Sequence, residues 1–420
     1  ICDVAECTLR EAIDASNRTL AADIITFNIP GVQCTGSGGT CEIHPLSPLP
    51  KINTAIAIDG YTQPGANANT STQDLGIGSN ALIKIEIDGT VAGGIGLDLA
   101  ATGNAVSVEG LAITDFATGI KVAEVTGLEN GVPVAGAVNS ATIEGDFEEY
   151  TVVLPSGITS LNVATSASTG DVDLYVRYGA PVSLSNWDCR PYDGVGDESC
   201  DFNAPAAGVY YVRVYGYQTG PLTFNITATW LGAGGPSGST VALGGNYLGL
   251  HADGSAGTQV NGLLFDGIAL QLGDGSARSM NVISGNQAEG VLIAGSRPSS
   301  TVSIQGNLIG TAPNGTSARP NQYGIKAVTS SNILGVSIGG AAPQSGNVIA
   351  RNTLDGIHLF CDATADVCFD GMQILGNYIG TNALGAVLGN LDDGIAISNL
   401  TGGQLSIGSS GRNGATVIHH

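Results

Sequence analysis

Short runs of alternating aliphatic and polar residues recur along the chain. Clear examples are GVLI at Gly290–Ile293, GIHL at Gly356–Leu359 and GIAI at Gly394–Ile397. Alternation places every second side chain on the same face, which is typical of a β-strand with one buried face. Gly and Asn stand between the runs and allow the backbone conformations of sharp corners. The pattern therefore predicts an all-β chain of short strands.

Two phrases repeat among these strands. The first reads GNYLG at Gly245–Gly249, GNLIGT at Gly306–Thr311 and GNYIGT at Gly376–Thr381; its Asn residues, at 246, 307 and 377, are 61 and 70 positions apart. The second reads NVISGN at Asn281–Asn286, NVIARN at Asn347–Asn352 and, truncated, TVIHH at Thr416–His420.

Recurring units of this kind bury their apolar faces by stacking on their neighbours. The repeats predict a parallel β-helix with about three coils per repeat, each of ~20–25 residues. Asn side chains at equivalent corners are expected to form an amide ladder. A β-sandwich or a propeller is the alternative, but either would show hairpin turns at shorter, regular spacing.

The N-terminal segment has a helix signal. Thr8-Leu9-Arg10-Glu11 is a capping box, and the helix that it starts is expected to cover the first rung of the β-helix. The chain begins abruptly at Ile1 and stops within the truncated phrase. An upstream leader, either removed or omitted, is therefore expected, and the two ends suggest either cuts through a longer stack or surfaces for end-to-end self-association.

The middle of the chain has a different texture. Between about residues 126 and 231 the Asn phrases vanish, aromatic residues concentrate, and alternation is strong in DVDLYVRY (Asp171–Tyr178) and VYYVRVY (Val209–Tyr215). This pattern predicts a separate β-sandwich inserted between two coils. The expected domains are 1–125 (helix and first coils), 126–235 (inserted sandwich) and 236–420 (further coils).

Composition restricts the environment. The 420 residues carry a net charge of −22, which disfavours nucleic acid as a partner, and no apolar run approaches the length of a membrane-spanning helix. The eight cysteines form close pairs that are expected to be disulfides, as in a protein secreted to an oxidising compartment. The expected pairs are Cys2/Cys7, Cys34/Cys41, Cys189/Cys200 and Cys361/Cys368.

Two family resemblances follow from quoted motifs. GDFEEYTVVLPSG at Gly145–Gly157, GDVDLYVRYGAP at Gly170–Pro181 and PAAGVYYVRVYGY at Pro205–Tyr217 resemble the bacterial pre-peptidase C-terminal (PPC) domain. CTLREAIDASN at Cys7–Asn17 and IDGYTQPGA at Ile58–Ala66, with the GNxIGT phrases, resemble secreted bacterial right-handed parallel β-helix repeat proteins. The first resemblance implies a small jelly-roll-like sandwich appended to secreted enzymes and surface proteins, some of which hold calcium and bind polymers.

Three sets of candidate site residues follow. By the PPC resemblance, Asp171 and Asp173, with Glu148, are candidate Ca²⁺ ligands, and a solvated acidic face is the alternative. Tyr211, Tyr215 and Tyr217 share one side of a strand and would bind a polymer if they face solvent, or fill the sandwich core if they do not. Asp392, Asp393 and Asp355 form a weaker catalytic candidate, because paired carboxylates suit hydrolysis. The sequons for glycosylation are at Asn17, Asn69, Asn225, Asn314 and Asn399.

The sequence thus favours a secreted or cell-surface structural or adhesive protein without catalysis, and possible assembly into an extracellular filament. In this interpretation the sandwich makes calcium-dependent contacts or contacts to a polysaccharide or protein polymer. The alternatives are a polysaccharide hydrolase or lyase that acts in a groove of the β-helix, and a passive carbohydrate- or polymer-binding module.

Overall fold

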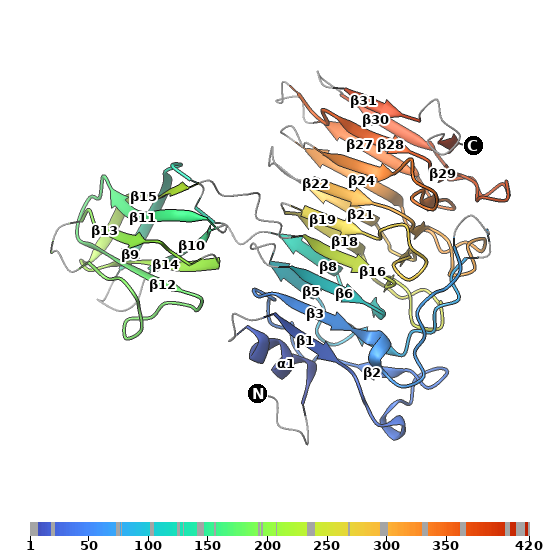
Figure 1. The fold of residues 1–420 in the computed structure, drawn as a ribbon, viewed down its shortest axis with the longest axis horizontal. Helices are drawn as coiled ribbons and strands as arrows, with labels where there is room; N and C mark the ends of the chain where they lie inside the picture. Colours follow the sequence, from blue (N-terminus) through green and yellow to red (C-terminus); the bar gives the residue numbers. More distant parts are fainter. Residues whose placement is uncertain are drawn as a thin grey trace.

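A computed structural model describes most of the chain (Figure 1). The description covers residues 7–17, 22–72, 76, 78–100, 105–123, 127–128, 130–140, 147–154, 157–191, 194, 196–206, 208–232, 240–267, 269–294, 301–329, 335–361, 367–399, 404–408 and 416–418. Within these residues nearly all regular structure is β-strand; the helices are α1 (Leu9–Ser16), η1 (Gly31–Gln33) and η2 (Gly60–Thr62). The expected all-β class is therefore confirmed.

Three long parallel sheets run along the stack (Figure 1). Sheet A contains, in spatial order, β1 (Asp23–Thr26), β3 (Ile56–Asp59), β6 (Val106–Glu109), β16 (Val241–Gly244), β19 (Ala269–Leu272), β22 (Thr301–Ile304), β25 (Val336–Gly339), β28 (Met372–Leu375) and β31 (Leu405–Ile407). Sheet B contains β2 (Cys41–Ile43), β4 (Ile85–Asp88), β7 (Leu111–Thr114), β17 (Tyr247–Leu248), β20 (Val282–Ile283), β23 (Leu308–Ile309), β26 (Val348–Ile349), β29 (Tyr378–Ile379) and β32 (Val417–Ile418). Sheet C contains β5 (Ile95–Ala100), β8 (Thr118–Ala123), β18 (Asn261–Asp266), β21 (Glu289–Ala294), β24 (Tyr323–Thr329), β27 (Ile357–Cys361) and β30 (Ile395–Ser398).

Neighbouring strands in each sheet come from successive coils, an arrangement compatible with a parallel β-helix. The inward positions are aliphatic and fully buried, as for Val291 and Ile293 of β21 and Ile357 and Leu359 of β27. They belong to one continuous hydrophobic core that runs through the stack. The alternation in the sequence therefore gave the inward face correctly, and the right-handed sense of the coil stays a prediction.

Buried asparagines stack at one corner of the coils. The side-chain amide of Asn246 donates to Asn281, that of Asn281 to Asn307, that of Asn307 to Asn347 and that of Asn347 to Asn377, over 2.8–3.2 Å. The expected ladder is confirmed, but the expected coil length is wrong. Successive rungs are 26–40 residues apart, so the two phrases occupy the same corner in alternate coils and each repeat holds two coils. The estimate was short because a coil contains three strands and their connecting loops.

The inserted segment forms two antiparallel sheets beside the stack (Figure 1). One sheet has the order β10-β14-β12 and the other β13-β11-β15-β9. A separate hydrophobic core fills the space between them, and Cys189–Cys200 is bonded at its edge. These strands lie within the predicted domain 126–235, whose exact limits stay a prediction. The bounds are β9 (Val134–Ser140), β10 (Phe147–Leu154), β11 (Ile158–Ser166), β12 (Val172–Tyr178), β13 (Ser199–Asn203), β14 (Gly208–Gly216) and β15 (Gly220–Gly232).

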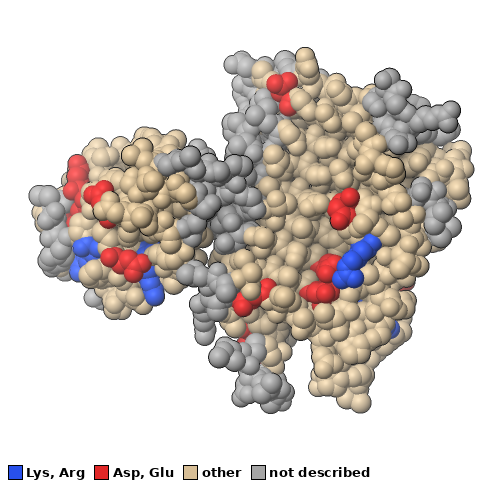
Figure 2. Space-filling model, viewed as in Figure 1, with Lys and Arg blue, Asp and Glu red and all other residues tan. Residues whose placement is uncertain are grey.

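The outer surface of the stack carries few charges on the side seen in Figure 2, where acidic and basic residues gather in small patches. At the N-terminal end of the stack, α1 lies beside β1 of the first coil (Figure 1). Thr8 and Glu11 form the predicted capping box, and Leu9 and Ile13 are buried in the core of the stack. The helix signal is therefore confirmed.

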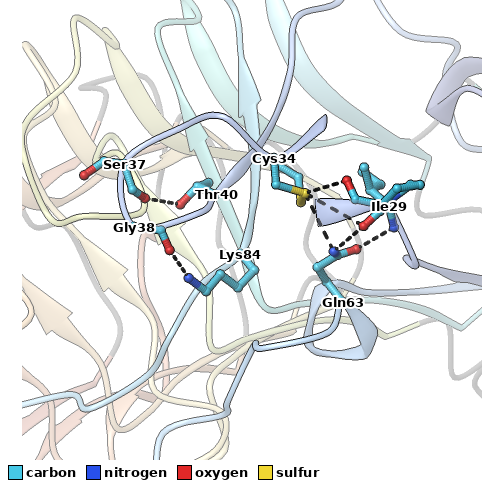
Figure 3. Close-up of a disulfide and its surroundings, with 9 residues drawn as sticks. Ile29, Cys34, Ser37, Gly38, Thr40, Gln63 and Lys84 are labelled. Carbon is cyan, nitrogen blue, oxygen red and sulfur yellow. Dashed lines mark hydrogen bonds between the residues drawn. A yellow bond between two sulfur atoms is a disulfide. The ribbon is translucent and has the colours of Figure 1, made fainter. Parts of the chain in front are cut away.

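Disulfides close short loops of the stack. Cys34–Cys41 and Cys361–Cys368 are formed, and Cys7 is disulfide-bonded, although Cys2 lies outside the described residues. Around the first bond, the Gln63 side chain exchanges two hydrogen bonds with the backbone of Ile29, at 2.8 and 2.9 Å (Figure 3). The cysteine pairing expected from sequence is confirmed wherever both partners are described.

Candidate functional site

The three carboxylates of the weaker catalytic candidate do meet on the stack. Asp355 lies two residues before β27, and Asp392 and Asp393 lie at a bend before β30, the next strand of sheet C. One carboxylate oxygen from each lies within 4.8 Å of the others. The backbone N–H of Asp393 also donates to Oδ1 of Asp355 over 3.0 Å. Adjacent residues of a strand face opposite ways, but Asp392 and Asp393 lie at a bend, so both carboxylates can face Asp355.

A histidine joins this cluster. His358, on β27, has Nδ1 2.7 Å from Oδ2 of Asp355, whose side chain is only 7% exposed. A buried carboxylate bonded to one ring nitrogen orients the ring and leaves Nε2 as the basic nitrogen. The His358 side chain is 20% exposed, so it remains in contact with solvent. Asp355 and His358 thus form an oriented acid–base pair.

Side chains of two preceding coils extend the cluster along sheet C. Lys326 of β24 is the register neighbour of His358, and its Nζ is 2.9 Å from Glu289. The Tyr323 ring lies 5.2 Å from the His358 ring and 4.5 Å from the Lys326 ammonium. The resulting sheet C cluster is a mixed acidic, basic and aromatic surface. Its members are Glu289, Tyr323, Lys326, Asp355, His358, Asp392 and Asp393.

Close approach between coils holds the cluster in place. A Cβ at Gly356 would lie 2.7 Å from both the Asn390 amide nitrogen and the Gly394 carbonyl oxygen. Only glycine, which has no Cβ, lets the coils approach this closely, so Gly356 allows the short distance between β27 and β30. Gly324 occupies the same place one coil earlier, and a Cβ added there would lie 2.5 Å from the Gly356 carbonyl oxygen.

Sequence reasoning missed Tyr323 and Lys326, although a signal was present. Gly324-Ile325-Lys326 and Gly356-Ile357-His358 share one pattern, and parallel register places equivalent positions side by side. Alignment of the coils on these glycines would have paired Lys326 with His358.

Of the predicted calcium ligands, the structure places Glu148 apart from Asp171 and Asp173, and calcium binding stays a prediction. Glu148 lies on β10, which β14 separates from Asp173 on β12. Asp173 is buried and forms an ion pair with Arg190 at 3.2 Å. Burial raises the pKa of Asp173, and the hydrogen bond from Arg190 opposes that effect. Asp171 has one buried carboxylate oxygen without a hydrogen-bond partner, the only feature among the three that suits a cation.

The predicted tyrosine row is interrupted. Val212 and Val214 face the sandwich core, as the exposed-row interpretation requires. However, Tyr215 is only 4% exposed, because it packs against Tyr175 and Val182; Tyr211 is half-buried, and Tyr217 is 37% exposed. The three side chains therefore do not form a continuous exposed surface, and polymer binding by them stays a prediction.

The sequons differ in accessibility. Asn69 is buried, and its amide nitrogen donates to the carbonyls of Ser71 and Ala277. Asn314 and Asn399 are exposed, whereas Asn17 and Asn225 are half-buried. Glycosylation stays a prediction at all five.

Comparison with known proteins concerns the sandwich. Residues 146–216 match the family model of the bacterial pre-peptidase C-terminal domain, so the chain contains a PPC domain. It is 39% identical over 91 residues to alkaline serine exoprotease A of Vibrio alginolyticus, 22% of this chain and 16% of that protein. It is 38% identical over 91 residues to a zinc metalloprotease of Helicobacter pylori, 22% of this chain and 34% of that protein. The match to an extracellular protease of Xanthomonas campestris is 39% over 92 residues, 22% of this chain and 15% of that protein.

The match thus spans between 15% and 34% of the length of these relatives. A solved PPC domain of a Bacillus anthracis collagenase is 14% identical and covers 26% of this chain and 96% of its own, with a TM-score of 0.21. The protein is secreted, as its relatives are and as its cysteines predicted. Within the described residues, no helix has the length and apolar character needed to cross a bilayer.

The relatives overturn the structural or adhesive interpretation. They are named as proteases, and they give no indication of a filament or an adhesin. Sequence reasoning weighted the repeats, which specify a shape, above the sandwich, which these enzymes share. End-to-end self-association stays an untested prediction.

Proposed function

We propose that this chain is a secreted hydrolase in which the sheet C cluster performs the chemistry and the PPC domain is an accessory domain. The observation that carries the proposal is the meeting of three carboxylates beside an oriented histidine. Nε2 of His358 removes a proton from water, while Asp355 stabilises the imidazolium that results. Asp392 and Asp393 are exposed and supply the second acid–base group.

The neighbouring side chains support this chemistry. Lys326, held by Glu289, places a positive charge beside the histidine, where negative charge develops on the substrate during attack. Tyr323 offers a ring against which a substrate can pack. The substrate is an extracellular polymer. Because the proteins that share the PPC domain are named as proteases, a protein substrate is favoured over a polysaccharide.

A divalent cation is a second candidate at the same place. Three carboxylate oxygens within 4.8 Å repel one another unless a proton or a cation lies between them. Ca²⁺ prefers oxygen ligands and completes its shell with water, so Asp355, Asp392 and Asp393 suit it better than the residues predicted in the sandwich.

One experiment tests both candidates. The purified chain is assayed on casein and on a panel of soluble polysaccharides, with and without EDTA and with added Ca²⁺. Replacement of His358→Gln or Asp393→Asn is expected to lower turnover about 10²–10⁴-fold, the usual contribution of a general acid or base. Asp266→Asn, an exposed carboxylate of the same sheet, is the matched control and should leave turnover unchanged.

The outcomes separate the candidates. Turnover that resists EDTA and is lost in both variants supports acid–base hydrolysis without a cation. Calcium binding by calorimetry that Asp393→Asn abolishes supports the cation site. Substrates left intact by the unmodified chain, together with no heat of calcium binding, would contradict both.

A further inference from the structure

A hollow of about 210 Å³ opens on the outer face of sheet A, away from the sheet C cluster. Its floor is formed by outward positions of three neighbouring strands, β6, β16 and β19. Register places Ala242 of β16 between Ser107 of β6 and Gln271 of β19. The hollow exists because small residues, Ala242, Gly244 and Gly273, lie between the larger side chains of Glu109 and Gln271.

The walls of the hollow are rich in hydrogen-bond acceptors. Glu109 lies at the end of β6, and Asp274 lies beyond the end of β19. The hydroxyls of Ser107 and Ser279 and the amide of Gln271 complete the polar lining. Acceptors in such number favour a ligand with several N–H donors.

The surrounding charge is negative. Arg278 binds Glu109 through two hydrogen bonds of 2.9 and 3.0 Å and lies 3.8 Å from Asp59. Burial raises the pKa of Asp274, but hydrogen bonds from Ser279 and Ser276 outweigh it and lower the pKa, so this carboxylate is ionised at neutral pH. The three carboxylates of Asp59, Glu109 and Asp274 therefore stand against the one guanidinium of Arg278. The net charge of −22 adds a general attraction for cations.

The aromatic ring nearby is already covered. The Arg278 guanidinium lies 5.1 Å from the centre of the Tyr61 ring, and the Tyr61 hydroxyl donates to the Gly245 carbonyl over 2.8 Å. A sugar ring commonly stacks on an exposed aromatic face, and this face is occupied. Charge and lining thus favour a cation over a neutral sugar.

We propose that the sheet A hollow binds a primary ammonium group on an unbranched alkyl chain, as found in a lysine side chain or a polyamine. The three N–H groups of the ammonium donate to Asp274, to the Ser107 hydroxyl and to the Gln271 carbonyl oxygen, while the Ser279 hydroxyl, which donates to Asp274, holds that carboxylate in place. The alkyl chain points outward through the open mouth. This site is independent of the proposed hydrolytic centre, which lies on another sheet.

The test measures binding of n-butylammonium to the whole chain by ligand-observed NMR, with n-butanol as the uncharged control. We expect a dissociation constant on the order of millimolar for the ammonium, weaker at high salt, and no binding of the alcohol. Ala242→Leu should fill the hollow, and Asp274→Asn should remove its charge; each is expected to weaken binding at least about fivefold, or about 1 kcal/mol.

Matched variants and ligands complete the design. Ser337→Leu, in the same outward row two strands beyond Gln271, and Asp266→Asn, on sheet C, should bind as the unmodified chain does. Nα-acetyl-lysine amide and spermidine then distinguish a protein partner from a free polyamine. Equal binding of n-butanol, or ammonium binding that Ala242→Leu leaves unchanged, would overturn the proposal.

Discussion

At the scale of the residue, one histidine ties separate coils of sheet B together. Nδ1 of His251 is 2.7 Å from Glu86 of β4, and Nε2 is 3.7 Å from Asp115, which follows β7. The second oxygen of Glu86 accepts a hydrogen bond from the Ala252 backbone. Burial lowers the pKa of His251, but the hydrogen bond and charge of Glu86, with the charges of Asp115 and Asp253, outweigh it and raise the pKa above its usual 6.5.

This arrangement gives stability a pH dependence with a definite sign. Because the pKa of His251 is higher in the folded state, its protonation stabilises the fold. This stabilisation is fully present below the unfolded-state pKa of about 6.5 and is lost as the pH rises through the folded-state pKa. We therefore expect His251→Gln to lower the free energy of unfolding by about 1–2 kcal/mol at pH 5.5 and by less at pH 8.5. Urea unfolding at a series of pH values measures the difference. His44→Gln, at a histidine that is 44% exposed, is the control, and an equal loss at both pH values would contradict the assignment.

Single residues also show where sequence reasoning succeeds and where it stops. Asp355, Asp392 and Asp393 could be proposed because paired carboxylates and a turn are visible in the sequence itself. Tyr323 could not be placed beside His358 without the register between coils. Tyr215 could not be judged either, because side-chain alternation does not say whether Tyr175 and Val182 cover its outer face.

At the scale of the element, strand and corner types were predictable but coil length was not. Local signals such as alternation, Gly and Asn depend on neighbouring residues, whereas the length of a coil depends on loops that follow no period. In the structure, two amide ladders show which residues are equivalent in successive coils and therefore how long each coil is. The second runs from Gln259 through Asn286, Asn321 and Asn352 to Asn390, with rungs of 2.8–3.1 Å.

The first ladder should contribute strongly to stability. The Asn347 amide donates to Ile304 and Asn377, and its oxygen accepts from the backbone and side chain of Asn307. Asn347→Ala removes one hydrogen-bond partner from each of these buried groups, and a buried group left unsatisfied costs about 1–3 kcal/mol, so a loss of about 3–5 kcal/mol is expected. Chemical denaturation measures it, with exposed Asn314→Ala as the control. A loss below about 1 kcal/mol would show that the ladder adds little to stability.

At the scale of the whole molecule, the stack continues across the insertion. Strand β6 before the sandwich pairs with β16 after it, β7 pairs with β17, and β8 with β18. The sandwich has its own core and its own disulfide, Cys189–Cys200. An insertion of this kind was predictable, because a solenoid coil contacts only its neighbours and an extra domain adds no packing requirement.

The two bodies should therefore fold independently. Replacement of residues 126–235 by a short Gly-Ser linker is expected to leave a stack that unfolds cooperatively, with a midpoint within about 5 °C of its transition in the full chain. Residues 126–235 alone should fold when Cys189 and Cys200 are oxidised. Calorimetry of the three proteins tests this, since two independent bodies give transitions that add up to that of the full chain.

Deletion of residues 269–300, one coil of the same stack, is the control and should be far more damaging, because it removes β19, β20 and β21 and forces strands of coils that are not neighbours to pair. If removal of the sandwich abolishes the transition of the stack, the pairs β6–β16, β7–β17 and β8–β18 are not sufficient to join its two halves.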